Sequence, residues 1–210
     1  MSVTFQDLLD RAGRLAAGGR RAALGITGPP GAGKTTLAEA LVGALGADVA
    51  HVPMDGFHLA DAELDRLGLR RRKGAPETFD PWGYAALLRR FREGTDEIVY
   101  APGFERTLEQ PIAGAIPVPR STRLVVSEGN YLLLDEPRWT AVRSLFDEVW
   151  YVDLDPAERI RRLVRRHVRF GKDQAAAVAW VAGTDERNAS RVAATRDRAD
   201  LIVVSADPLE

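Results

Sequence analysis

Short runs of consecutive apolar residues recur along the chain, separated by stretches with apolar side chains at intervals of three and four. Continuous apolar runs of about four to eight residues predict buried strands, and the spaced pattern predicts amphipathic helices. Five strands are expected, at residues 22–26, 48–54, 124–127, 148–154 and 201–204, and residues 130–133 are expected to continue the third. Strands that alternate with helices indicate a three-layer α/β domain with a mainly parallel five-stranded sheet.

Helical patterns fill the intervals between these strands. The first expected helix covers residues 3–17, where Thr4 and Asp7 form a capping pair and Gly18 ends the helix. Asp80 and Pro81 have the chemistry of a helix start, as N-cap and first helical residue. Further helices are expected at residues 36–42, 61–69, from Asp135 and Pro137 onward, at 156–170 and at 175–181, with a helical turn at 185–189.

Residues 28–35, Gly-Pro-Pro-Gly-Ala-Gly-Lys-Thr, fit the phosphate-binding motif G-x-x-x-x-G-K-[ST]. The motif follows a predicted strand and precedes a predicted helix, which is the context that the motif requires. Backbone N–H groups of such a loop surround anionic oxygens, the lysine reaches the β- and γ-phosphates, and the threonine hydroxyl binds Mg²⁺. We therefore expect ATP and Mg²⁺ as cofactors. The expected nucleotide-binding residues of the loop are Gly28, Gly31, Ala32, Gly33, Lys34, Thr35 and Thr36.

Two carboxylates follow predicted strands, at the edge where parallel sheets bind their ligands. Asp55 comes after the second strand, and we expect it to accept or orient the proton of a hydroxyl acceptor. The alternative is a turn residue, because Asp-Gly is a common turn sequence. Glu128 comes after the third strand, where a carboxylate can bind Mg²⁺ together with Thr35. The expected catalytic residues are Asp55, Lys34, Glu128 and Arg166.

Residues 56–119 are expected to form the acceptor side of the site. Within them, residues 95–119 are rich in proline and too long for a simple connection, which leaves a functional loop or a hairpin insertion. Tyr100, Glu105 and Arg106 are candidates for holding the acceptor, with ordinary loop structure as the alternative. His58 either lines the acceptor pocket or caps the next segment, and Asn188 completes the expected set.

Residues 156–173 form an arginine-rich segment that we expect to act as a lid. Arg162, Arg166 and Arg169 are spaced at i, i+4 and i+7 and therefore share one helix face. Low apolar content argues against burial and favours a helix that closes over a polyphosphate and offsets its charge. The alternatives are a helix that binds nucleic acid and a solvated helix paired with carboxylates.

Composition narrows the classes of function. The net charge of the 210 residues is −1, which does not favour bulk binding of nucleic acid, and no apolar run approaches a membrane span. The absence of cysteine excludes disulfides and thiolate metal sites. The first residues show neither the basic nor the apolar region of a signal peptide. We expect a single-domain cytoplasmic protein over residues 1–210, with a small-molecule partner and no nucleic acid or membrane, and leave a homodimer open.

Several stretches, in order along the chain, give it a resemblance to the uridine kinase and pantothenate kinase group of P-loop kinases. This group includes small kinases labelled as fructose-transport kinases. The matching stretches are residues 28–35, Met54–His58, 68–80, Tyr100–Phe104, Ser127–Asn130 and Thr195–Ala199. The run at 68–80 is most similar to bacterial pantothenate kinases, whereas the lid with residues 171–173 is more similar to uridine kinases.

The resemblance implies a sheet order of 2-3-1-4-5, with Asp55 as the catalytic aspartate, Glu128 as the Walker B acid and lid arginines that contact ATP phosphates. We expect ATP-dependent phosphoryl transfer to a hydroxyl of a small metabolite, such as a nucleoside, a pantothenate-like compound or a sugar. The alternatives are a nucleotide-dependent switch or partner-binding ATPase, and a nucleic-acid-modifying kinase. The chain has no Asn-Lys-x-Asp guanine motif, which argues against a GTPase.

Overall fold

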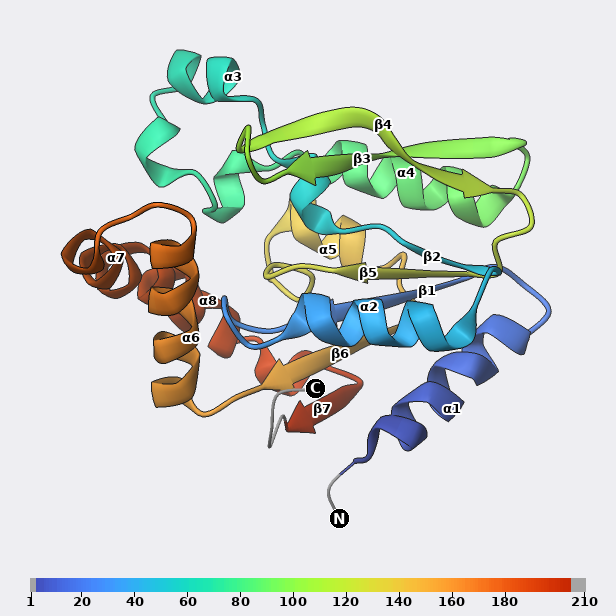
Figure 1. Ribbon diagram of the computed structural model, residues 1–210. Coiled ribbons are helices and arrows are strands. Elements are labelled where there is room, and N and C mark those ends of the chain that lie inside the picture. Colours follow the sequence, from blue (N-terminus) through green and yellow to red (C-terminus); the bar gives the residue numbers. More distant parts are fainter. Residues whose placement is uncertain (1–2, 205–210) are drawn as a thin grey trace.

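Five parallel strands form the central sheet of the computed structural model, which describes residues 3–204 (Figure 1). The strands are β1 (Ala22–Thr27), β2 (Val49–His51), β5 (Leu124–Glu128), β6 (Glu148–Asp153) and β7 (Leu201–Val204). They pair in the order β2-β5-β1-β6-β7, and every pair is parallel. Counted among these five strands alone, the order reads 2-3-1-4-5, as the resemblance implies. The predicted α/β fold is confirmed.

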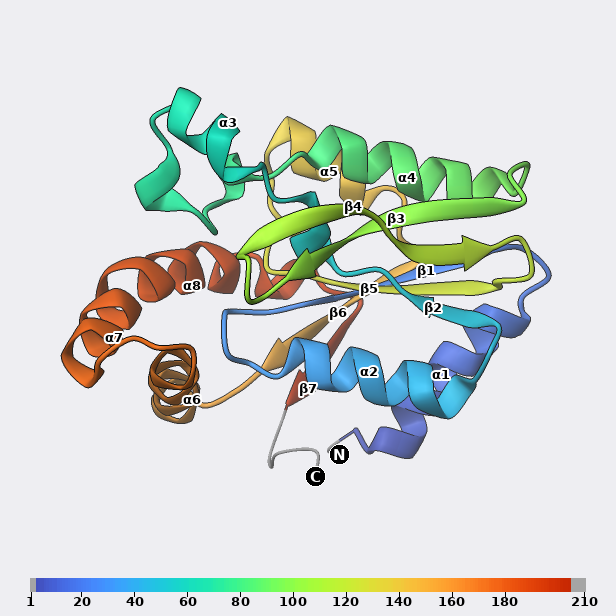
Figure 2. The ribbon, with the colours of Figure 1, turned by 45° about the horizontal axis from the view of Figure 1, so that its top comes forward.

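Helices cover both faces of the sheet and give the fold its three layers (Figures 1 and 2). The covering helices are α1 (Phe5–Ala17) and α2 (Lys34–Leu45) on one face, and α4 (Pro81–Glu93) and α5 (Pro137–Arg143) on the other. In β1, Leu24 packs in the core with α1 and α2, whereas its neighbour Ala23 packs in the core with α4 and α5. This alternation follows from the two-residue period of a strand.

The helix ends follow the expected capping chemistry in two places. Thr4 and Asp7 form a capping box at α1, where the Asp7 N–H donates to Thr4 Oγ1 at 3.2 Å. Asp80 accepts from the N–H of Gly83 at the start of α4. At α5, however, the N-cap position is held by Glu136 instead of Asp135, and no side chain caps the helix.

Residues 95–119, for which the sequence allows a functional loop or a hairpin insertion, contain an antiparallel hairpin. β3 (Ile98–Glu105) and β4 (Gln110–Pro119) form a separate two-stranded sheet. Val99 and Val118 bury one face of the hairpin in the core with α4 and α5. The hairpin is therefore held against the core by apolar packing and is not a free loop.

The second strand ends earlier than its apolar pattern predicts. β2 stops at His51, and Met54–Phe57 form a 3-10 turn. The N–H of Val52 still reaches the neighbouring strand, but Pro53 has no N–H to continue the ladder.

The apolar pattern predicts that residues 130–133 continue β5. In the structure they form a turn instead. The N–H of Leu134 bonds the carbonyl of Tyr131 at 3.1 Å and folds the chain back. Tyr131, Leu132 and Leu133 are nevertheless buried in the core with α4 and α5. Burial of a turn thus produces the same run of apolar residues as a buried strand.

The remaining elements lie around the carboxyl ends of the strands (Figure 1). They are α3 (Asp61–Arg66), the 3-10 turns Arg70–Arg72 and Pro76–Thr78, α6 (Pro156–Arg169), α7 (Gln174–Trp180), the π-helical turn Val181–Asp185, α8 (Glu186–Ala193) and the 3-10 turn Arg196–Arg198. The separate helical predictions at 175–181 and 185–189 merge into one helical stretch, because the π-helical turn joins them. No helix between residues 3 and 204 is long and apolar enough to cross a membrane.

Candidate active site

The phosphate-binding loop lies between β1 and α2, and its backbone requires glycine. Gly28, Gly31 and Gly33 have φ values of 145°, 82° and 95°, which side chains rarely adopt. Gly33 is the N-cap residue of α2, and no side chain caps the helix there. The first N–H groups of α2 are therefore available to an anion, as at other helix N-termini that bind phosphate.

Lys34 is buried beneath this loop, where its Nζ donates to the carbonyl of Pro29 at 3.1 Å. Burial lowers the pKa of Lys34, and the carboxylates of Glu128 and Asp55 oppose that shift. Within residues 3–204 the hydrogen-bond partner of the ammonium is a neutral carbonyl, and hydrogen bonds to phosphate oxygens are stronger. The position of Lys34 therefore fits the β- and γ-phosphates of a bound nucleotide.

Glu128 ends β5 and is buried beside the start of α2, where Thr35 Oγ1 donates to its Oε1 at 3.2 Å. Burial raises the pKa of Glu128, Asp55 raises it further, and Lys34 lowers it. Adjacent hydroxyl and carboxylate oxygens suit Mg²⁺, which takes few protein ligands and completes its shell with phosphate and water. Among the described residues, no cluster of three or more His, Asp or Glu could hold a metal by itself. The residues present thus fit Mg²⁺ that arrives with ATP.

Asp55 lies in the 3-10 turn after β2, at the same edge of the sheet as Glu128 and the loop. Its Oδ2 accepts a hydrogen bond from Arg106 Nη2 at 3.0 Å, and its charge acts on both Lys34 and Glu128. The structure thus brings together four predicted site residues, Lys34 and Thr35 of α2, Glu128 of β5 and Asp55 of the 3-10 turn, from three separate elements. Three of them can act on phosphate and metal, and the fourth, Asp55, is exposed enough to meet an acceptor.

His58 closes the turn that carries Asp55. Its Nδ1 lies 2.8 Å from the backbone carbonyl of Asp55, and its ring packs against Phe79 and Phe104 at centroid distances of 3.9 and 4.9 Å. Burial lowers the pKa of His58, which favours the neutral ring. In this position His58 supports the turn, and its ring forms part of the wall beside Asp55.

The other acceptor candidates lie at different distances from this centre. Tyr100 is exposed on the outer face of the hairpin, and the Glu105 carboxylate accepts from Thr107 in the hairpin turn. Neither side chain forms a hydrogen bond or ion pair with the Asp55 carboxylate within residues 3–204, whereas Arg106 does. Asn188, on α8, is buried and its Nδ2 lies 3.4 Å from the carbonyl of Gly74, in the acceptor-side segment.

Helix α6, the predicted lid, rests directly on the phosphate loop (Figure 1). Leu163 occupies the space over Gly31, where a Cβ would lie 2.7 Å from Leu163 Cγ. Arg159 is only 4% exposed, donates to the carbonyl of Pro30 at 3.4 Å and forms an ion pair with Glu186 of α8. The base of the lid is therefore already packed on the loop.

The three predicted lid arginines differ in their partners. Arg162 pairs with Glu158 at 2.8 Å, whereas Arg166 and Arg169 form no ion pair within residues 3–204. With Arg165 and Phe170, the three line a cavity of about 350 Å³. Arg166 also lies close enough to Lys34 to lower its pKa. Arg166 therefore lies on the side of α6 that faces Lys34 and the phosphate loop.

Arg159 and Leu163 were not singled out from the sequence, although they fall on the helix face of Arg166 at i, i+4 and i+7. That spacing could have identified them. Tyr84 and Ser127 share a buried hydrogen bond beneath the site, and Ser127 Oγ donates to the carbonyl of Val52. No sequence signal joins these groups, because they come from three separate segments.

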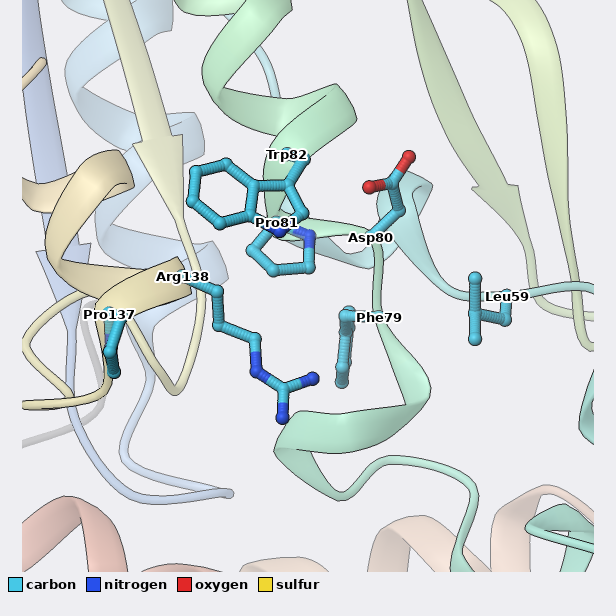
Figure 3. Close-up of a pocket in the computed structure, with 7 residues that line it drawn as sticks. All are labelled: Leu59, Phe79, Asp80, Pro81, Trp82, Pro137 and Arg138. Carbon is cyan, nitrogen blue, oxygen red and sulfur yellow. The ribbon is translucent and has the colours of Figure 1, made fainter. Parts of the chain in front are cut away.

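A larger hollow of about 480 Å³ lies elsewhere, at the starts of α4 and α5 (Figure 3). The residues that line it are Leu59, Phe79, Asp80, Pro81, Trp82, Pro137 and Arg138. None of the predicted site residues lines it. Cavity size alone therefore does not locate the candidate site, whereas the convergence of charged groups does.

Comparison with known proteins places this geometry in a family. Residues 23–207 match the family described as "Phosphoribulokinase / Uridine kinase family". The chain is 34% identical over 177 residues to "Putative uridine kinase C227.14" of Schizosaccharomyces pombe, which covers 80% of this chain and 75% of that relative. It is 35% identical over 190 residues to YggC of Escherichia coli, with 88% and 78% covered.

A solved structure shows the same architecture. The "putative fructose transport system kinase" from Silicibacter sp. TM1040 has a TM-score of 0.84 and 38% identity, over 95% of this chain and 98% of that one. The family match includes the phosphate loop, Asp55, Glu128 and α6. The chain therefore belongs to the phosphoribulokinase / uridine kinase family of P-loop kinases.

Proposed function

We propose that this kinase transfers the γ-phosphoryl group of ATP to a hydroxyl group of a small metabolite, with Asp55 as the residue that receives the hydroxyl proton. One observation carries the proposal. Asp55 stands at the carboxyl edge of the sheet, close enough to Lys34 and Glu128 for its charge to shift the pKa of both. A carboxylate in this place can meet both the acceptor and the γ-phosphate.

Each site residue has one task in this reaction. The N–H groups of the loop and Lys34 bind the phosphates of ATP, while Thr35 and Glu128 hold Mg²⁺, which supplies positive charge to the phosphate oxygens. Asp55 orients the acceptor hydroxyl and takes its proton as the new oxygen–phosphorus bond forms and the bond to ADP breaks. Arg166 and Arg169 offset the negative charge of the transferring group.

The acceptor class rests on the surroundings of Asp55 and on the names of the relatives. The side chain of Arg106 and the buried amide of Asn188 offer donors to a polar, hydroxyl-bearing compound. One relative is named for uridine and one structural neighbour for fructose transport. Nucleosides and sugars therefore come first in a search, and pantothenate-like compounds follow.

The test is a screen for acceptor-dependent ADP release. Purified protein with MgATP is assayed against nucleosides, sugars, pantothenate and glycerate, and mass spectrometry identifies the phosphorylated product. Lys34→Ala serves as the control for contaminating kinases. We expect one acceptor to raise ADP release and gain one phosphate. Hydrolysis that no hydroxyl compound accelerates, with a partner protein raising it instead, would contradict the proposal.

A further inference from the structure

Strand β3 of the hairpin lies directly against the 3-10 turn that carries Asp55. Gly56, the next residue after Asp55, has no room for a Cβ, because one would overlap the backbone carbonyl of Pro102 in β3. This close approach places the hairpin on the turn that carries the carboxylate. The path of the hairpin over that turn can be followed in Figure 2.

The hairpin turn is also attached to residues 61–73, the segment that contains α3. Lys73 is mostly buried, pairs with Asp61 at 2.7 Å and donates to the carbonyl of Glu109 in the turn. The N–H of Asp61 donates to the side chain of Gln110 at 3.2 Å. The end of the turn that leads into β4 is therefore held by two residues of the 61–73 segment.

Arg106 extends from this turn to Asp55 and occupies its Oδ2. The guanidinium is stacked near the ring of Phe104, with its Cζ 5.4 Å from the ring centroid. The side chains of Arg106 and Asp55 remain 49% and 27% exposed, so solvent weakens their attraction. A competing ligand can therefore break the ion pair between Arg106 and Asp55.

We propose that Arg106 makes the kinase selective against water, by covering the proton-accepting oxygen of Asp55 until an acceptor displaces the guanidinium. This inference rests on the proposed role of Asp55. In the suppressed reaction, a water oxygen forms a bond to the γ-phosphorus, the bond from that phosphorus to the ADP oxygen breaks, and a water proton passes to Asp55 Oδ2. Arg106 already donates to that same oxygen, so it competes with a water molecule for orientation there and lowers the basicity of the carboxylate.

A true acceptor differs from water in what it offers to Arg106. A sugar, a nucleoside or a carboxylate-bearing compound has further oxygens that can accept the hydrogen bonds that the guanidinium gives up. Water bound in the same place has no such second group. Arg106 therefore couples occupation of the acceptor site to the release of Asp55.

The experiment measures phosphate release from MgATP at saturating nucleotide, with no acceptor present. Arg106→Ala and Arg106→Gln are compared with wild type, with Asp55→Asn and with the Asp55→Asn/Arg106→Ala double variant. Arg66→Ala is the matched control, because Arg66 forms an exposed ion pair with Glu63 on α3. Lys34→Ala shows whether the hydrolysis comes from the phosphate loop. Thermal unfolding verifies that each variant is folded.

We expect both Arg106 variants to hydrolyse ATP about two- to fivefold faster than wild type, the range that a partly exposed ion pair supports. Arg66→Ala should match wild type, and the increase should vanish in the Asp55→Asn background. Raising KCl from about 0.05 to about 0.5 M should bring wild type closer to the Arg106 variants, because salt screens exposed pairs.

Two results would overturn the inference. Hydrolysis that is unchanged or slower in folded Arg106 variants would show that the contact does not restrain Asp55. An increase that persists in the Asp55→Asn background would show that it comes from another change. A different result would contradict the proposed function, namely full acceptor-dependent phosphoryl transfer by the Asp55→Asn single variant.

Discussion

Gly31 is the point where the phosphate loop touches the lid helix, and Gly31→Ala tests that contact. The Cβ of alanine would lie 2.7 Å from Leu163 Cγ and 3.2 Å from the carbonyl oxygen of Arg159, where ordinary contacts begin at 3.4 Å. Both neighbours belong to α6. The substitution therefore acts on the loop and on the lid at once.

Two costs add at this position. An L-residue at a φ of 82° is strained by roughly 1–2 kcal/mol. Overpacking against Leu163 adds about 1–3 kcal/mol if α6 stays in place. The sum is about 2–5 kcal/mol, unless α6 moves away from the loop. Movement of α6 relieves the overlap but displaces Arg162 and Arg166 from the nucleotide.

Gly19→Ala is the matched control for backbone strain. Gly19 has a φ of 77°, close to that of Gly31, and a Cβ there would have nothing within 4 Å. We expect Gly19→Ala to lower only the unfolding temperature, by about 2–4 °C for each kcal/mol in a chain of this size. Gly31→Ala should in addition lower the affinity for MgADP at least tenfold, about 1.4 kcal/mol, in a calorimetric titration.

A second substitution separates the overlap from the strain. Leu163→Ala removes the closest atoms that the new Cβ would strike and leaves the Arg159 carbonyl, so Gly31→Ala/Leu163→Ala should bind MgADP more tightly than the sum of the single effects predicts. The reasoning is refuted if Gly31→Ala binds nucleotide as Gly19→Ala does. It is equally refuted if the effects of the two substitutions simply add.

Three further substitutions test the rest of the nucleotide site. Lys34→Ala should nearly abolish turnover and weaken ATP binding without unfolding the protein; normal activity would show that the loop is not a phosphate site. Glu128→Gln should weaken binding of MgADP while leaving metal-free ADP binding unchanged in calorimetry, because the carboxylate acts on the metal; an equal loss in both titrations would make its role structural. Arg166→Ala/Arg169→Ala should reduce turnover strongly, since such arginines are worth up to ~10³–10⁵ in rate, with acceptor KM little changed; a normal rate would make α6 a solvated helix.

The parts of the site that could be predicted from the sequence are those whose position follows from a local rule. The glycine-rich loop and Asp55 follow strands, Glu128 ends one, and the carboxyl ends of parallel strands lie at one edge of the sheet. The sheet order followed from the resemblance and is confirmed. The apolar runs located the strands but did not show where two of them end. β2 ends before Pro53, and β5 ends before the turn at residues 130–133.

The parts that could not be predicted depend on contacts across long stretches of chain. Arg106 and Asp55 are 51 residues apart, and they meet because the hairpin packs on Gly56 and its turn is held by Lys73 and Asp61. Low apolar content argued against burial of the lid helix, yet Arg159 is buried because the carbonyl of Pro30 and Glu186 satisfy it. Tyr100 was predicted to hold the acceptor, but the alternation of side chains along β3 places it on the exposed face of the hairpin.

The central claim is that Asp55 serves the acceptor and not the nucleotide. The most direct measurement compares Asp55→Asn with wild type, for acceptor-dependent phosphoryl transfer and for the affinity of MgATP in a calorimetric titration. Asparagine keeps the shape of aspartate but accepts no proton, so transfer should fall roughly 10²–10⁴-fold while the affinity for MgATP stays close to that of wild type. Retained transfer, or loss of MgATP binding together with the fold, would contradict the account.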